Sequence, residues 1–177
     1  MEEHGVVGRA GASGRISFRP IRPDDAAFLY KVYASTRLDE LAVVDWDDTQ
    51  KASFLHRQFA AQHQFSQERY TSTDFLIILC DAVPVGRLSV ARWEDEIRIV
   101  DIALLPPYRH TGIGTAILTD LLAEAQRIGK PVRIHVEKNN PALSLYTRLG
   151  FTPLADRGVY WFLEWSPGGA GQAPTAS

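Results

Sequence analysis

The sequence predicts a single domain of the mixed α+β class. A chain of 177 residues fits one domain, and a hydrophobic content of 45% supports a sizeable core. Three apolar runs separated by short turns, residues 74–79, 85–93 and 96–105, predict an antiparallel meander. A strand, helix and strand over residues 96–136 predict one parallel pair, because only a crossover of this length can join parallel neighbours. We expect a central mixed sheet of about six to seven strands with about four flanking helices.

The N-terminal half adds one strand and two helices before the meander. Residues 16–21 alternate apolar and polar side chains and form the first strand. Pro23 opens a helix, since proline suits the first helical position and the acids that follow it suit the positive end of the dipole. A second helix covers about residues 49–64. Residues 81–84 form a turn, and Gly86 marks a bulge or a close approach of two backbones.

The C-terminal half continues with a helix, a strand, a short helix and a hairpin. The first of these helices has an apolar stripe, made of Ile113, Ile117, Leu121, Ala125 and Ile128. Residues 132–136 form the parallel strand. Asn140 and Pro141 begin the short helix, and Gly150 ends it in a left-handed conformation. Residues 151–154 and 159–165 form a closing hairpin around residues 156–158.

Composition limits the rest of the chain and its partners. Residues 1–14 predict a flexible arm, residues 15–166 the domain, and residues 167–177 a disordered tail, because both ends are rich in small residues without a period. A net charge of -2 argues against nucleic acid or membrane as a partner. The single cysteine, Cys80, excludes an intrachain disulfide and a thiolate metal cluster. We expect a cytoplasmic protein without a metal, either a monomer or a homodimer.

A strand that runs into a glycine-bearing turn predicts an anion site. Pro106 and Pro107 stop the strand, and the turn holds Arg109, Gly112 and Gly114. The first amides of a helix lack partners inside it, and glycines let a phosphate approach the backbone closely. The turn lacks the Gly-Lys-Ser/Thr of a P-loop, so a nucleotide-binding protein is disfavoured. A glycine-rich helix start without a ligand remains the alternative.

The pattern Arg-x-x-Gly-x-Gly after a strand resembles the acyl-CoA diphosphate loop of the GCN5-related N-acetyltransferases, the GNAT superfamily. A second stretch, VEKNNPALSLYTRLGF at residues 136–151, resembles that superfamily's second cofactor motif. The resemblance covers about residues 16–165 and is strong from Val85 onward. It implies the GNAT fold, in which the parallel pair splays apart to admit acetyl-CoA.

The resemblance implies a set of cofactor-binding residues. The pantetheine arm would pair with the central strand at Ile102, Ala103 and Leu104. The diphosphate would rest on the turn, formed by Arg109, His110, Thr111, Gly112, Ile113, Gly114 and Thr115. The second motif adds Asn139, Ala142 and Tyr146. Tyr146 is the candidate general acid, because a phenol in reach of the sulfur can protonate the departing thiolate. A core aromatic is the alternative for Tyr146, and helix capping is the alternative for Asn139.

The base that removes the amine proton is left open by the sequence. Asp101 on the central strand is the first candidate, and Glu96, Glu137 and His135 are the others. Asp101 could equally be a buried acid paired with an arginine such as Arg98 or Arg133. A chain of water molecules could serve instead of any single side chain.

The resemblance implies that the first two helices and their loop shape the acceptor side. The acidic stretch there includes Asp39, Glu40 and Trp46, and its carboxylates tilt the expectation toward a cationic amine. We therefore expect an acetyl-CoA-dependent N-acetyltransferase acting on a small-molecule or peptide amine by direct attack in a ternary complex. The alternative is an acyl-CoA-binding module, a sensor or interaction protein without turnover.

Overall fold

The computed structural model describes residues 15–69 and 72–168, without the side chains of Asp39 and of residues 63–69. The predicted arm at residues 1–14 lies outside the described residues, as does the predicted tail from residue 169 onward. The strands are β1 (Ile16–Pro20), β2 (Thr73–Cys80), β3 (Val83–Arg92), β4 (Ile97–Leu104), β5 (Val132–Glu137), β6 (Thr152–Arg157) and β7 (Tyr160–Trp165). The α-helices are α1 (Ala26–Leu41), α2 (Asp48–Arg69), α3 (Ile113–Ile128) and α4 (Leu143–Arg148).

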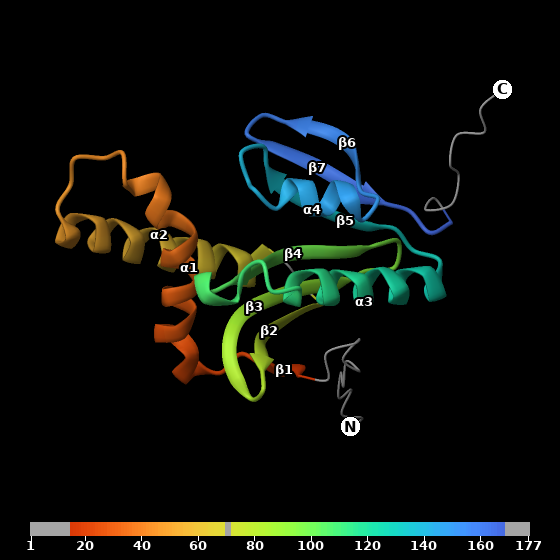
Figure 1. The fold of residues 1–177 in the computed structure, drawn as a ribbon, viewed down its shortest axis with the longest axis horizontal. Coiled ribbons are helices and arrows are strands. Elements are labelled where there is room, and N and C mark those ends of the chain that lie inside the picture. The colour runs from red at the N-terminus through yellow and green to blue at the C-terminus, as the bar shows by residue number, and fades with distance from the viewer. Residues whose placement is uncertain (1–14, 70–71, 169–177) are drawn as a thin grey trace.

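The strands form one 7-stranded sheet in the order β1-β2-β3-β4-β5-β7-β6 (Figure 1). Neighbours pair antiparallel except β4 and β5, which run parallel and are connected by α3. The predicted fold, a mixed sheet with an antiparallel N-terminal half and one parallel pair, is confirmed. The second helix is longer than expected and reaches Arg69.

The parallel pair is joined along only part of its length. The register pairs Ile97 with Val132 and continues to Ile99 opposite Ile134, and no later pairing of β4 with β5 occurs in the described part of the chain. β4 nevertheless continues to Leu104. Figure 1 shows β5, β7 and α4 diverging from the part of the sheet that holds β1 to β4. One edge of β4 is therefore open at its C-terminal end, as expected of a splayed pair.

A bulge in β4 lies where the two strands separate. On the other side of β4, Val90 pairs with Ile99 and Ser89 pairs with Asp101, so Val100 is the extra residue. A bulge bends its strand and increases the local twist, and therefore helps β4 turn away from β5. Because of the bulge, Val100 and Asp101 both line one cavity, which lies between the sheet and the first two helices.

The helices cover opposite faces of the sheet. α3 packs on one face through a stripe of buried residues, namely Ile113, Ile117, Leu118, Leu121, Leu122 and Ala125. Ile128 was predicted to belong to this stripe, but it is 48% exposed because it is the last residue of the helix, before Gly129. α1 and α2 lie on the other face, where Leu29 and Phe59 approach β2, β3 and β4.

An ion pair fixes the start of α1. Arg19 on β1 donates to both carboxylate oxygens of Asp25 at 2.8 Å, and the backbone N–H of Arg22 donates to the same carboxylate at 2.7 Å. The Arg19 hydrogen bond lowers the pKa of Asp25 from 3.8 to about 2. The predicted opening at Pro23 is a short 3₁₀ turn, Pro23–Asp25, which leads into α1.

Two predicted turns are shorter in the structure. The predicted turn at residues 81–84 is limited to Asp81 and Ala82, whose φ angles are 50° and 65°. The predicted turn at residues 156–158 is instead centred on Gly158 and Val159, because β6 extends to Arg157. Two-residue hairpin turns match the right-handed twist of the flanking strands. In both hairpins the strands therefore stay paired up to the residues next to the turn, Cys80 with Val83 and Arg157 with Tyr160.

Gly86 combines both roles that the sequence allowed. A Cβ atom at this position would lie 2.2 Å from the carbonyl oxygen of Ala103 on β4. The register of β2 with β3 also shifts beside it, since Gly86 pairs with Ile78 while Pro84 pairs with Leu79. Only glycine therefore allows β3 and β4 to approach this closely at the open end of the sheet.

Candidate active site

The turn between β4 and α3 presents a run of unbonded amides. Arg109 N–H donates to the Pro106 carbonyl at 3.2 Å, and Ala116 N–H donates to the Gly112 carbonyl at 3.0 Å. Between them, the N–H groups of residues 110–115 donate to no acceptor within the described residues. These donors lie at the positive end of a 16-residue helix. The arrangement suits a diphosphate or another extended anion.

The glycines of this turn are not required by packing against the rest of the chain. A Cβ at Gly112 or at Gly114 would meet nothing within 4 Å. Gly112 has a φ of 88°, so its backbone alone favours glycine. Gly114 has no such constraint and lies in a helix, where glycine costs about 1 kcal/mol relative to alanine. The space over Gly114 is therefore open to a group that approaches the amides of the turn.

The other predicted residues of the turn have identifiable places. Thr111 donates through Oγ1 to the Tyr108 carbonyl at 2.6 Å and stabilises the turn. His110 has an exposed side chain and a left-handed φ of 58°. Ile113 is buried in the core, and the Thr115 carbonyl accepts from Thr119 Oγ1 at 2.7 Å. The Ile113 side chain thus belongs to the core and the Thr111 hydroxyl to the turn, whereas the His110 side chain is exposed.

The Arg109 side chain connects the turn to α1. Its Nε donates to the Leu104 carbonyl at 3.0 Å, and its Nη2 approaches the carbonyl and the hydroxyl of Ser35 at 3.3 and 3.2 Å. The sequence placed this charge beside the phosphate, whereas its hydrogen bonds in the structure fix α1 to the end of β4. Leu104, together with Ile102 and Ala103, lies on the stretch of β4 that β5 leaves unpaired. A carbonyl has two lone pairs, so Leu104 can still accept from a ligand.

Tyr146 lies on α4 and is buried, with 4% of its surface exposed. Its ring packs edge-on against Phe151 at a centroid distance of 5.5 Å. Burial, and after it the negative charge of Asp101, raise the pKa of Tyr146 above its ordinary value. The raised pKa means that the hydroxyl keeps its proton near neutral pH.

The loop before α4 is organised by Asn140. Its Oδ1 accepts from the Ala142 N–H at 2.9 Å, and its carbonyl accepts from Leu143 N–H at 3.0 Å. The sequence predicted Asn140 as the N-cap and Pro141 as the first helical residue, but α4 begins at Leu143 and its N-cap is Ala142. Asn140 instead forms a side-chain turn two residues long that leads into the helix. Asn139 is exposed, and Ala142 is half-buried. Both asparagines are exposed, and Asn140 organises the loop through its bond to Ala142.

Asp101 forms an ion pair with Arg87 on β3, and not with Arg98 or Arg133 as the sequence suggested. The reason is the sheet register. Asp101 lies opposite Ser89, which places Arg87 on the same face of the adjacent strand. Of the four candidate bases, Asp101 is the one whose charge acts on the Tyr146 hydroxyl.

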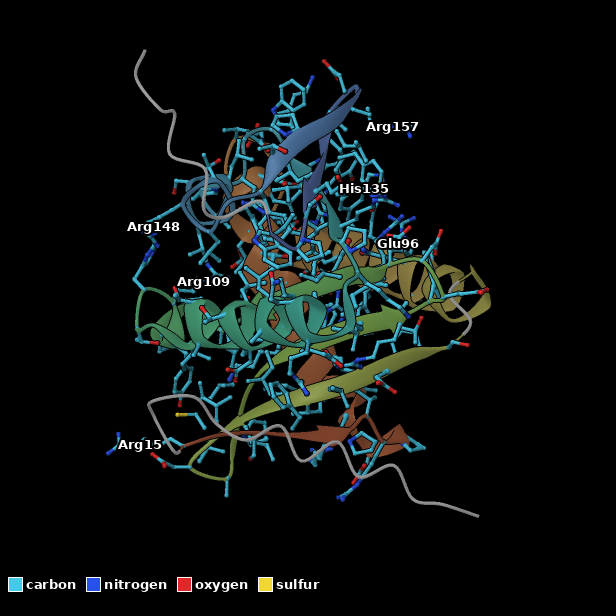
Figure 2. The ribbon with its side chains drawn as sticks, turned by 90° about the vertical axis from the view of Figure 1, so that its right-hand side faces the viewer. Arg15, Glu96, Arg109, His135, Arg148 and Arg157 are labelled. Carbon is cyan, nitrogen blue, oxygen red and sulfur yellow. The ribbon has the colours of Figure 1, made fainter. Side chains whose placement is uncertain are left out.

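Arg98 and Arg133 belong to a different ion-pair network. Both approach the buried carboxylate of Glu96, at 2.9 and 3.2 Å, and Arg133 also pairs with Glu164 on β7 at 2.7 Å. Figure 2 shows Glu96 and Arg109 on opposite sides of the molecule. The network therefore joins β4 to its neighbours at the closed end of the pair, and Glu96 is not placed to act as a base at the open end.

The remaining candidate bases also have other contacts. His135 is exposed and stacks on Phe162, with the ring centroids 4.4 Å apart, on the side of the molecule where Glu96 lies (Figure 2). Glu137 accepts from Arg37 on α1 at 3.2 Å, an ion pair that bridges the end of β5 to α1. Neither lines the cavity beside Asp101.

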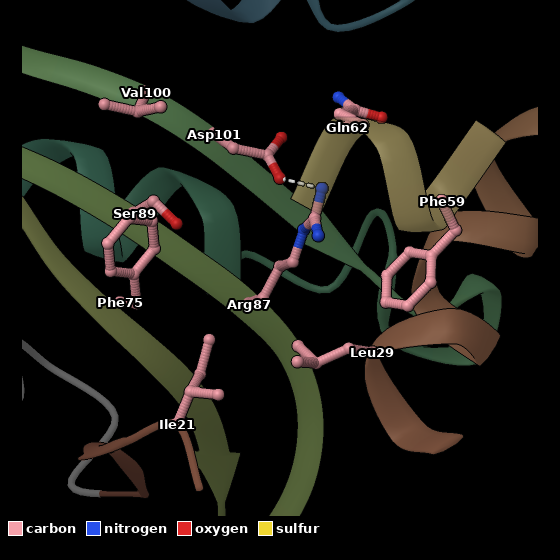
Figure 3. A pocket seen from close by; sticks show the side chains of 9 residues that line it. All are labelled: Ile21, Leu29, Phe59, Gln62, Phe75, Arg87, Ser89, Val100 and Asp101. Carbon is pink, nitrogen blue, oxygen red and sulfur yellow. Dashed lines mark ion pairs between the residues drawn. The ribbon is translucent and has the colours of Figure 1, made fainter. Parts of the chain in front are cut away.

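A cavity opens beside Asp101, between the sheet and the helices α1 and α2 (Figure 3). Arg87, Ser89 and Asp101 line its sheet side, and Leu29 and Phe59 line its helix side. Sequence reasoning missed Arg87, although a single arginine in the apolar run at residues 85–91 was a usable signal.

The acidic stretch predicted to bind the acceptor does not line this cavity. Glu40 pairs with Arg37 at 3.1 Å, and Trp46 packs edge-on against Phe54 at 5.3 Å. The backbone of Asp39 belongs to α1, but its side chain lies outside the described residues.

Within the described ranges, no group of three or more His, Cys, Asp or Glu side chains could hold a metal ion. None of the described helices has the length and apolar character needed to cross a bilayer. Cys80 is half-buried, packs against the main core and does not line the cavity beside Asp101.

Comparisons with known proteins agree with this geometry. The profile of the Acetyltransferase (GNAT) family matches residues 14–151. The PaiA N-acetyltransferase of Thermoplasma acidophilum, solved in complex with coenzyme A, superposes with a TM-score of 0.64 at 19% identity, covering 85% of this chain and 98% of that chain. The ribosomal-protein-S18-alanine N-acetyltransferase of Escherichia coli gives 0.58 at 14% identity, covering 92% and 99%. At these identities the likeness shows a shared fold.

A curated relative adds sequence similarity over a shorter stretch. An N-alpha-acetyltransferase of Sulfurisphaera tokodaii is 38% identical over 56 residues, which cover 30% of this chain and 34% of the relative. The aligned stretch is thus about a third of that protein, whereas the family profile extends from β1 to the end of α4. Because the profile matches most of its length, the chain belongs to the GNAT family of acetyltransferases.

Proposed function

We propose that this protein is an acetyl-CoA-dependent N-acetyltransferase that transfers an acetyl group to a primary amine by direct attack in a ternary complex. The observation that carries the proposal is the run of unbonded amides at residues 110–115, next to the open edge of β4. The GNAT family membership and the coenzyme A complex of a structural neighbour support it.

The residues present fit the cofactor. The amides of residues 110–115 would hold its diphosphate, with Gly112 and Gly114 leaving room for close approach. Ile102 to Leu104 pair with β3 on one side, and β5 leaves their other edge unpaired. This open edge would hold the pantetheine arm as an added strand. When bound, acetyl-CoA supplies an activated acetyl thioester.

Tyr146 serves as the hydrogen-bond donor to the sulfur. Its raised pKa keeps the hydroxyl protonated at neutral pH. An ordinary thiol has a pKa of about 8.5, so complete transfer of the proton from this tyrosine to a thiolate is uphill. We therefore infer that Tyr146 stabilises the departing sulfur by donating a hydrogen bond, with solvent delivering the proton afterwards.

Asp101 holds the acceptor's amino group and accepts a proton from it directly or through water. Arg87 balances the charge of Asp101 when no acceptor is present. Cys80, the single cysteine of the sequence, lies on β2 against the core and does not line the cavity. Direct attack by the amine on the thioester is therefore the expected route.

Thiol release from acetyl-CoA over a panel of primary amines tests the function, with calorimetry of coenzyme A binding as a parallel measurement. Amine-dependent thiol release is the expected result. Tight binding without release for any amine would favour the second candidate, an acyl-CoA-binding module without turnover, which the same amides support. Absence of binding would contradict both.

A cytoplasmic location, and a monomer or homodimer without nucleic acid or membrane partners, stay predictions.

A further inference from the structure

The cavity beside Asp101 has one apolar wall and one charged wall. Leu29 and Phe59, from α1 and α2, supply the apolar wall, and Figure 3 shows them opposite the sheet. Arg87 and Asp101, from β3 and β4, supply the charged wall and form an ion pair. A molecule that fills this cavity must therefore present an apolar group to the helices and polar groups to the sheet.

Arg87 retains an unused donor. Its Nε is buried and has no hydrogen-bond partner within the described residues, although its Nη2 contacts Asp101. Asp101 Oδ2, which Arg87 Nη2 contacts as an ion pair, is likewise buried without a hydrogen-bond partner within the described residues. Buried polar groups without partners are rare in native proteins, so this pair suits a ligand that brings both an acceptor and a donor. Asp101 keeps 34% of its side chain exposed and can contact a second partner besides Arg87.

The charged wall is neutral overall, which limits the charge of its ligand. Asp101 contributes one negative charge and Arg87 one positive charge, and the other lining residues, such as Ser89 and Gln62, are uncharged. A polyamine would bring several positive charges to a single carboxylate that Arg87 already shares. A zwitterion adds no net charge, because its ammonium meets Asp101 while its carboxylate meets Arg87.

Resting on the proposed function, we propose that this cavity is the acceptor subsite and that it takes an α-amino acid with an apolar side chain. Asp101 receives the amino group, the Arg87 guanidinium receives the carboxylate, and Leu29 and Phe59 contact the side chain. Asp101 directly precedes Ile102, where the stretch of β4 proposed to hold the pantetheine arm begins, so the amino group lies beside the path of the donor. The ammonium first loses one proton to Asp101 or through water to solvent. The nitrogen then forms the new C–N bond as the C–S bond breaks and loses its second proton, and the sulfur leaves with the electron pair and gains one proton.

The test compares kcat/KM for thiol release among acceptors that differ in one feature each. Leucine, methionine and phenylalanine supply both features, leucinamide lacks the carboxylate, serine lacks the apolar side chain, and spermidine lacks both. We expect leucine to exceed leucinamide, serine and spermidine by at least ~10-fold, since each analogue leaves a buried group unpaired or apolar surface uncovered. Equal rates for leucine and leucinamide, or a preference for spermidine, would overturn the proposal.

A variant pair isolates the role of Arg87. Arg87→Lys keeps the positive charge beside Asp101 but removes the planar guanidinium and its Nε donor. We expect KM for leucine to rise by roughly 10-fold or more while KM for leucinamide changes less than about 3-fold. Arg92→Lys is the control, because Arg92 lies on the same strand but pairs with Asp74 and Glu124 outside the cavity. An equal rise for both acceptors in Arg87→Lys would contradict the assigned contact, and unchanged coenzyme A binding shows that the variant is folded.

Calorimetry with leucine and the coenzyme A complex separates this proposal from the proposed function. Leucine binding without thiol release from acetyl-CoA supports the subsite and contradicts turnover. Thiol release with other amines but not with leucine supports turnover and overturns the subsite. A protein that binds coenzyme A but neither binds leucine nor releases thiol contradicts both.

Discussion

Replacing Gly114 by alanine is expected to stabilise the fold and to weaken coenzyme A binding at the same time. Gly114 lies in the first turn of α3, and a Cβ there would meet nothing within 4 Å of the protein. Alanine is favoured over glycine in a helix by up to about 1 kcal/mol. For a chain of this size, such a gain raises Tm by about 2–4 °C.

The binding loss follows from the same open space. The added methyl group would occupy the approach to the amides of residues 110–115, which donate to no described acceptor. A hydrogen bond to a charged group contributes about 1.5–3 kcal/mol, so losing one weakens Kd roughly 10- to 100-fold. Stability and binding are therefore predicted to move in opposite directions.

Scanning calorimetry measures the first effect and titration calorimetry with coenzyme A measures the second. Thr119→Ala is a matched control, because Thr119 is exposed on the same helix and gains helix propensity away from the turn. The gain in helix propensity should raise Tm, and the loss of the hydrogen bond from Thr119 to the Thr115 carbonyl should cancel part of that rise. The Kd for coenzyme A should stay unchanged. If Gly114→Ala binds coenzyme A as tightly as the original protein, the diphosphate does not rest on these amides.

Further predictions concern the proton donor, the start of α1 and the close contact at Gly86. Tyr146→Phe should lower kcat about 100-fold or more while coenzyme A binding and Tm stay the same, because phenylalanine keeps the buried ring and its edge-on contact with Phe151 and removes only the hydroxyl; an unchanged kcat would exclude Tyr146 as the donor. The pKa of Asp25 falls from 3.8 to about 2 on folding, so its ion pair with Arg19 stabilises the protein above the unfolded pKa and is lost as pH falls through the folded value. This contribution is about 2 kcal/mol at most, and the Tm advantage over Asp25→Asn should shrink between about pH 4 and 2; a constant difference would contradict the shift. Gly86→Ala should cost about 2 kcal/mol or more and lower Tm by several degrees, because its Cβ would lie 2.2 Å from the Ala103 carbonyl oxygen; an unchanged Tm would mean that β3 and β4 can separate here without cost.

The sequence alone determined the parts of this protein that depend on short-range spacing. The turn at residues 109–114 was recognisable because its glycines and the helix that follows are local features. The core stripe of α3 follows from the helical period, and only Ile128 at its end was wrong. The strand–helix–strand unit fixed the parallel pair, since a crossover of that length leaves few topologies.

Only the tertiary structure decided which distant side chains meet. The sequence offered Arg98 or Arg133 as examples of a partner for Asp101, yet a bulge at Val100 and the register of β3 brought Asp101 to Arg87. The cavity joins residues from the end of β1, α1, α2, β2, β3 and β4, which no local pattern relates to one another. A period reports which face a residue occupies, whereas its partner depends on strand register and helix packing, and these are set by the whole core at once.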